Sequence, residues 1–233
     1  MRDGERPDIA TRGLDRLTGA DLRFLAENFP RPAATYDEMA RVLREMPSTL
    51  ESLLEAEYVY RAIFEQRREL LEISPFLLFN VLLRRCMEGA RTATERAVVN
   101  YLANLLALFV RAERVHRPDA GEPRSYQYFV DLAAAAAASG DERESFLLHA
   151  HIGNYGLYLS GVYRDALEYA HRYRRRPVSP RYVADMGRAG YRDAAASRLA
   201  RAYGLEDVFL HLALRFDHYR ERLNRLAREY LFD

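Results

Sequence analysis

The clearest structural signals lie in residues 74–110, which read SPFLLFNVLLRRCMEGARTATERAVVNYLANLLALFV. Ser74 followed by Pro75 is typical of a helix start, because serine caps the first turn and proline fits its first position. Thr92 and Glu95 form a capping-box pattern, which predicts a second helix start. The residues that follow each start are apolar on nearly every side. Such composition is typical of helices buried at the centre of a bundle.

Similar helix starts and stops continue through the rest of the chain. The predicted longer helices cover residues 35–46, 48–74, 75–87, 93–114, 126–139, 141–160, 163–175, 180–203 and 205–230. Alternating strand patterns with hairpin turns are absent from the sequence, so no sheet is predicted. Short connections favour antiparallel neighbours. The prediction is an all-α fold, a compact bundle of about nine mostly antiparallel helices.

The predicted domain organisation follows the proline and glycine pattern. Residues 1–34 are expected to form an irregular N-terminal arm with at most one short helix, and residues 35–233 a single helical-bundle domain. A polar loop at residues 117–124, with two prolines and a glycine, is the candidate for an internal boundary.

The cysteine count and the hydropathy of the sequence exclude several classes of protein. The single cysteine, Cys86, excludes an intramolecular disulfide and a cysteine zinc cluster. The first sixteen residues are charged and lack the apolar core of a secretory signal. The longest apolar run, residues 97–110, is too short to span a bilayer. The expectation is a cytoplasmic protein without a membrane span.

Residues 172–201 hold nearly all of the charge asymmetry. They contain nine arginines and two aspartates, a charge of +7 in a chain whose net charge is +1. The residues predicted to bind an anion or an acidic partner are Arg172, Arg174, Arg175, Arg176, Arg181, Arg188 and Arg192. A local excess of guanidinium attracts anions whatever the net charge, because salt screens each field within about 10 Å.

Tyrosines are interleaved with these arginines, and residues 155–203 contain eight of the sixteen in the chain. The predicted partner is an acidic protein surface or an anionic ligand. Single-stranded nucleic acid or a phosphorylated ligand is the alternative. Arginines bind the phosphates of nucleic acid, and aromatic rings stack on its bases. The sequence pI of about 7.9 counts against it, because dedicated nucleic-acid binders are more basic. Self-association is left open.

A second candidate site lies on the helix at 141–160. His149, Gly153 and Gly156 fall on one face by the helical period, and glycine is unfavourable inside a helix. Close approach of another helix is the favoured interpretation. The alternative is a small-molecule or cofactor pocket, reaching Asn100 and Asn104 on the central helix, which would leave an enzymatic function open.

Glu168 and His171 have the Glu-x-x-His spacing found in di-iron bundles. Di-iron bundles also need further glutamates that project into the bundle, so no metal and no cofactor are predicted. Motifs for nucleotide binding and for nucleophilic catalysis are also missing. The functional prediction is a non-enzymatic interaction module that presents an arginine- and tyrosine-rich surface, residues 172–201, to an acidic partner.

Overall fold

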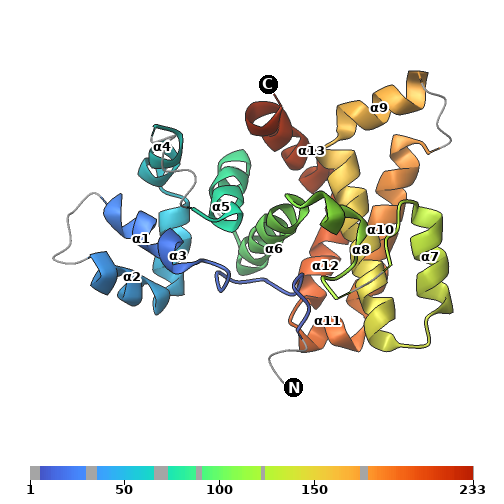
Figure 1. Ribbon diagram of the computed structural model, residues 1–233, viewed down its shortest axis with the longest axis horizontal. Coiled ribbons are helices and arrows are strands. Elements are labelled where there is room, and N and C mark those ends of the chain that lie inside the picture. The colour runs from blue at the N-terminus through green and yellow to red at the C-terminus, as the bar shows by residue number, and fades with distance from the viewer. Residues whose placement is uncertain are drawn as a thin grey trace.

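The computed structural model describes residues 6–29, 36–65, 73–87, 91–121, 124–173 and 178–232. In these ranges the chain is helical and contains no strand, which confirms the all-α prediction (Figure 1). The α-helices are α1 (Gly19–Glu27), α2 (Tyr36–Arg44), α3 (Pro47–Leu54), α4 (Glu57–Glu65), α5 (Pro75–Cys86), α6 (Ala93–Phe109), α7 (Phe129–Ala138), α8 (Glu142–Gly161), α9 (Arg164–Tyr173), α10 (Pro180–Ala196), α11 (Arg198–Ala202), α12 (Glu206–Leu214) and α13 (Phe216–Leu226). A 3-10 helix (Ala112–His116) and a π-helical turn (Ala227–Leu231) complete the described elements.

The two central helices start at the predicted caps. The Ser74 hydroxyl accepts a hydrogen bond from the Leu77 amide, and Pro75 occupies the first turn of α5. At the start of α6, the Thr92 hydroxyl accepts from the Glu95 amide while the Glu95 carboxylate accepts from the Thr92 amide. Both helices are buried along most of their length, as their apolar composition requires.

The described residues contain thirteen α-helices rather than about nine, because predicted long helices are interrupted. At Ser197 the backbone is extended, and its hydroxyl accepts from the Leu199 amide, which starts α11. Serine inside a helix competes for backbone hydrogen bonds in this way. At Arg215 the chain turns between α12 and α13. The turn lets α12 pack on α6 and α10 while α13 packs on α5 and α8. The predicted helix at 48–74 is likewise interrupted after Leu54.

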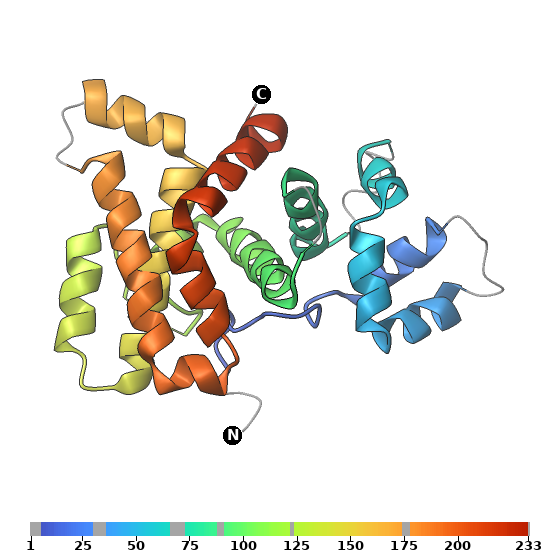
Figure 2. The same ribbon diagram turned by 180° about the vertical axis from the view of Figure 1, so that it is seen from behind.

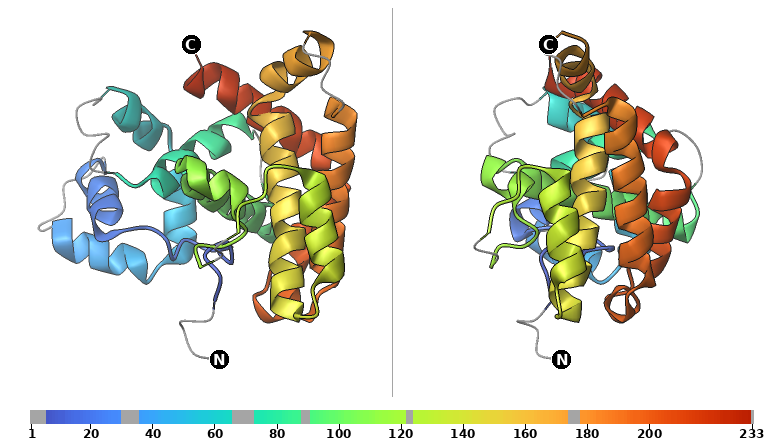
Figure 3. Two further views of the ribbon diagram at one scale, coloured as in Figure 1. Left: turned by 45° about the vertical axis from the view of Figure 1, so that its right-hand side comes forward. Right: turned by 90° about the vertical axis from the view of Figure 1, so that its right-hand side faces the viewer.

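The helices gather at two ends of the molecule, with α5 and α6 between them (Figures 1 and 2). Helices α1 to α4 form one end. Helices α7, α8, α10 and α12 run side by side at the other, and α9 lies across one end of this group (Figure 3). None of the described helices is both long and apolar enough to cross a membrane.

The N-terminal arm is irregular up to α1, but its described part is packed against the body. Ile9, Ala10 and Thr11 are buried. The side-chain amide of Asn104 on α6 donates to the backbone oxygen of Asp8 over 2.9 Å. One turn earlier, the Asn100 amide donates to the Arg12 oxygen over 3.3 Å. The two asparagines thus hold an extended segment.

Candidate functional site

The arginines of the 172–201 window divide into a group with close ion pairs, of which Arg188 is the one predicted docking residue, and a group that is exposed. Three arginines of the 172–201 window form close ion pairs within the chain, and two of the four carboxylates involved come from distant segments. The pairs are Arg188 with Asp185 and Asp217, Arg198 with Glu142, and Arg201 with Glu206. Arg188 also lies over the Phe216 ring, 5.4 Å from its centre. The C-terminal half of the window is therefore mostly compensated.

The remaining described arginines are exposed. Arg172 and Arg192 have no carboxylate within ion-pair distance among the described residues. The Arg181 side chain is 93% exposed, and its Nε lies 3.7 Å from an Asp185 oxygen, a long and solvated contact. The other predicted arginines, Arg174, Arg175 and Arg176, lie outside the described residues.

The eight tyrosines of residues 155–203 also divide. Four are in the core, where they fill the space between helices: Tyr155, Tyr158, Tyr191 and Tyr203. Four are exposed: Tyr163, Tyr169, Tyr173 and Tyr182. Sequence spacing alone did not separate these groups, because the buried face of each helix depends on which helix packs against it.

Exposed arginines and tyrosines meet on α9 and the first turn of α10, two helices that contact each other. We call the set Tyr169, Arg172, Tyr173, Arg181 and Tyr182 the α9–α10 surface. No residue of α9 is buried. Tyr169 and Tyr173 are 56% and 64% exposed, and their ring centres are 4.9 Å apart. Large exposed aromatic side chains of this kind are enriched at protein interfaces.

The predicted glycine face of α8 is covered by α10. A Cβ atom at Gly153 would collide with the Tyr191 ring, and one at Gly156 would lie 2.5 Å from Cα of Gly187. Gly190 of α10 fits in the same way against the backbone of Gly153. The glycines allow two helix backbones to touch, which is the favoured interpretation of the sequence.

The contacts of Gly153 and Gly156 with α10 leave no room for the alternative pocket on this face. The Tyr191 ring and the α10 backbone occupy the space that a ligand would need. Asn100 and Asn104 do not line such a pocket either, since they bind the N-terminal arm.

Below this crossing lies a buried amide that the sequence patterns did not reveal. The Asn154 side-chain oxygen accepts hydrogen bonds from the hydroxyls of Tyr101 (2.7 Å) and Tyr191 (2.9 Å). All three residues are buried. The arrangement ties α6, α8 and α10 together and is structural. The position of Asn154 among the apolar residues of α8 was the signal in the sequence that could have indicated this buried amide.

A second feature missed from the sequence is the buried guanidinium of Arg84 on α5. Its side chain is 1% exposed and pairs with Glu51 of α3 over 2.5 Å. It also donates to the side-chain oxygens of Asn80 and Asn100, in the second case over 3.0 Å. Asn100 in turn donates to Glu51 over 3.0 Å. The four-residue spacing of Asn80 and Arg84 indicated one shared face, but not the partner from α3.

His151 of α8 is 1% exposed, and its Nε2 has no hydrogen-bond partner among the described residues. Burial, reinforced by Arg114 and His116, lowers the pKa of His151 to about 3. In the unfolded chain histidine titrates near pH 6.5. The unfolded state therefore binds a proton before the folded state does, and stability is lost as the pH falls from about 6.5 towards about 3.

We expect His151→Leu to remove this pH dependence. At pH 5 the protonation of His151 in the unfolded state costs the wild type about 2 kcal/mol that the variant does not lose. Urea unfolding of both proteins at pH 7 and at pH 5 measures the difference. An identical fall in stability for the two proteins would contradict the assignment.

Glu168 and His171, whose spacing is found in di-iron bundles, are on the exposed helix α9. Glu168 pairs with Arg164 over 2.9 Å, and His171 is exposed near the end of the helix. Within the described part of the chain, no group of three or more histidine, cysteine, aspartate or glutamate side chains is placed to hold a metal ion.

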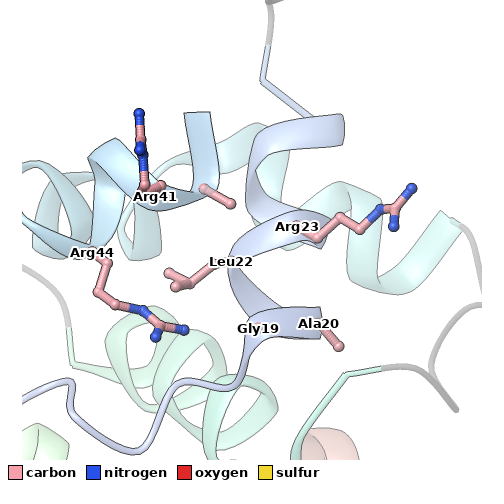
Figure 4. A pocket seen from close by; sticks show the side chains of 7 residues that line it. Gly19, Ala20, Leu22, Arg23, Arg41 and Arg44 are labelled. Carbon is pink, nitrogen blue, oxygen red and sulfur yellow. The ribbon is translucent and has the colours of Figure 1, made fainter. Parts of the chain in front are cut away.

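A hollow of about 580 Å³ lies between α1 and α2 and is lined by three arginines, Arg23, Arg41 and Arg44. Figure 4 shows that their guanidinium groups point in different directions from the two helices. They do not converge on a common point, so the hollow does not form an anion site.

The α9–α10 surface is thus the part of the predicted site that combines exposed aromatic rings with exposed arginines. Comparisons with protein-family models, curated proteins and solved structures found no match. The side chains of this surface offer charge-assisted hydrogen bonds and ring contacts, which suit binding. They include no nucleophile paired with a base.

Proposed function

We propose that the protein is a binding module that holds an acidic partner protein on the α9–α10 surface. The observation that carries the proposal is that α9 buries none of its residues, so the large rings of Tyr169 and Tyr173 lie mostly in solvent. Leaving such rings exposed forgoes the free energy of burial, which a partner restores when it covers them.

The charge of the segment supports an acidic partner. Residues 169–184 contain five arginines and no aspartate or glutamate. Arg172 and Arg181 are the described members, and both extend into solvent. Arginine pairs with carboxylates in a bidentate geometry, so these side chains would set the position of the partner while the tyrosines supply contact area.

Single-stranded nucleic acid is the second candidate. The contact between the Tyr169 and Tyr173 rings favours it, because exposed aromatic rings provide platforms on which bases stack. The two candidates differ in salt dependence. A protein that contacts several phosphates of a nucleic acid loses affinity for it by orders of magnitude between low and moderate salt.

The experiment is a charge reversal with a matched control from the same window. Arg172→Glu with Arg181→Glu changes two exposed arginines, of which Arg181 makes only the long contact with Asp185, whereas Arg198→Glu with Arg201→Glu changes two that form closer ion pairs. Fluorescence anisotropy with a labelled poly-glutamate peptide and with a single-stranded oligonucleotide measures binding. We expect the first variant to weaken peptide binding at least about tenfold and the second to change it much less.

Circular dichroism checks the folding of the two double variants. Both should retain the wild-type helicity, because the four substituted arginines are exposed. Equal losses in the two variants would show that general charge, and not this surface, attracts the peptide. Oligonucleotide binding that exceeds peptide binding and falls steeply with salt would replace the acidic-protein proposal with the nucleic-acid one.

A further inference from the structure

A small cavity of about 150 Å³ lies between the start of α6 and helix α13, away from the residues of the α9–α10 surface. Its polar lining consists of Arg91, Glu95, Arg215, His218, Tyr219 and Arg222, and Met87 and Val99 supply apolar wall. The lining brings together distant segments: Glu95 and Arg215, which are hydrogen-bonded, lie 120 positions apart in the sequence. Three of these side chains are arginines and one is a carboxylate.

Glu95, the carboxylate, is already occupied. One of its oxygens accepts from the Thr92 amide (2.9 Å) and from the Thr92 hydroxyl (3.1 Å) in the capping box. The other accepts from Arg215 over 3.2 Å. Glu95 therefore compensates at most one of the three arginines of the lining.

Arg91 is fixed and nearly buried. Its side chain is 10% exposed and pairs with Glu55 over 2.6 Å. It also donates to the backbone oxygens of Arg84 and Met87, while its Nε is buried without a partner among the described residues. These bonds fix the position of the Arg91 side chain, which lines the cavity.

Arg222 is half-buried and has no carboxylate within ion-pair distance in the part of the chain that the structure describes. The pKa of His218 reports the positive potential that Arg215 and Arg222 produce in the cavity. Burial lowers the pKa of His218, and Arg215 and Arg222 lower it further, against the smaller opposing effects of Glu95 and Glu221.

We propose that this cavity binds a small oxyanion of the phosphate or sulfate class. Arg91, Arg215 and Arg222 would supply the charge-assisted hydrogen bonds, with the Tyr219 hydroxyl and the His218 ring beside them. The volume limits the ligand. Pockets for drug-sized molecules occupy about 300–1,000 Å³, so this cavity admits a free ion or one phosphoryl group of a larger molecule.

Isothermal titration calorimetry with inorganic phosphate, with sulfate and with a nucleoside monophosphate tests the site. We expect phosphate and sulfate to bind. Monophosphate binding no tighter than that of inorganic phosphate would identify a free ion as the ligand class. Tighter monophosphate binding would identify the phosphoryl group of a metabolite that extends out of the cavity. Absence of heat with all three at millimolar concentrations would overturn the proposal.

Two variants with opposite expected effects separate binding from misfolding. Arg222→Gln should weaken sulfate binding about tenfold, since it removes one charge-assisted contact. Glu95→Gln should strengthen it by a similar factor, because it removes the carboxylate charge but keeps an oxygen for the Thr92 amide. A damaged fold would not raise affinity. The control Arg228→Gln changes an exposed arginine outside the cavity and should leave binding unchanged.

The histidine ring gives a direct local signature. A bound sulfate should raise the pKa of His218, because a nearby anion stabilises the imidazolium. NMR titration of the His218 ring with and without sulfate measures this. Binding that leaves the His218 titration unchanged, or that Arg222→Gln does not weaken, would place the ion elsewhere and refute the site.

Discussion

Replacing Gly156 with alanine should lower the free energy of unfolding by about 2 kcal/mol, although alanine is the better helix former. The new methyl group would lie 2.5 Å from Cα and 2.9 Å from the amide nitrogen of Gly187. These are backbone atoms, which cannot rotate away as the tip of a side chain can. Helices α8 and α10 must therefore separate, and the loss of packing exceeds the gain of about 1 kcal/mol in helix propensity.

Gly140→Ala provides the matched control. Gly140 is exposed, and a methyl group added there would have no described atom within 4 Å. Its backbone does not adopt a left-handed conformation. The same chemical change should then be neutral or stabilise the protein by up to about 1 kcal/mol, through the lower entropy of the unfolded chain. Urea unfolding measures both variants. Equal stability of Gly156→Ala and Gly140→Ala would refute the close contact between α8 and α10.

Replacing Glu51 with alanine should have the largest effect, a loss of about 3–5 kcal/mol. The Arg84 side chain is 1% exposed, and Glu51 is its charged partner at 2.5 Å. Without Glu51 the guanidinium keeps its hydrogen bonds to Asn80 and Asn100 but loses its compensating charge. A buried charge without a partner is costly because water no longer solvates it.

The combination of Glu51→Ala with Arg84→Met tests that cause. Removing the buried charge should recover part of the stability lost in Glu51→Ala, although it leaves Asn80 and Asn100 with fewer partners. Glu142→Ala is the surface control, since Glu142 pairs with the exposed Arg198 over 2.7 Å and should change stability little. A double variant less stable than Glu51→Ala alone would show that the unpaired charge is not the source of the loss.

The helix starts were predictable because a cap depends on residues within four positions of each other. The side-chain oxygens of Ser74 and Thr92 accept the amide hydrogen bonds that their sequence patterns indicate. The interruption at Arg215 was not predictable in this way. It occurs where α12 and α13 pack against different helices, which is a property of the assembled core.

The candidate site was predictable only in part, for the same reason. Counting charges located an arginine-rich window, but the carboxylates that neutralise Arg188 and Arg198 include Asp217 and Glu142, which come from other parts of the chain. The cavity between α6 and α13 went unnoticed, because Arg91 and Arg222 are far apart in the sequence.

The sequence by itself determined that the chain is helical, where its central helices start and that glycines on one face of α8 accommodate a close neighbour. These features follow from backbone propensity and the helical period, which act over a few residues. The tertiary structure alone decided which arginines remain free, which tyrosines stay exposed and where the N-terminal arm lies. Charge compensation and burial depend on distances in space, and the packed core sets those distances between segments remote in the chain.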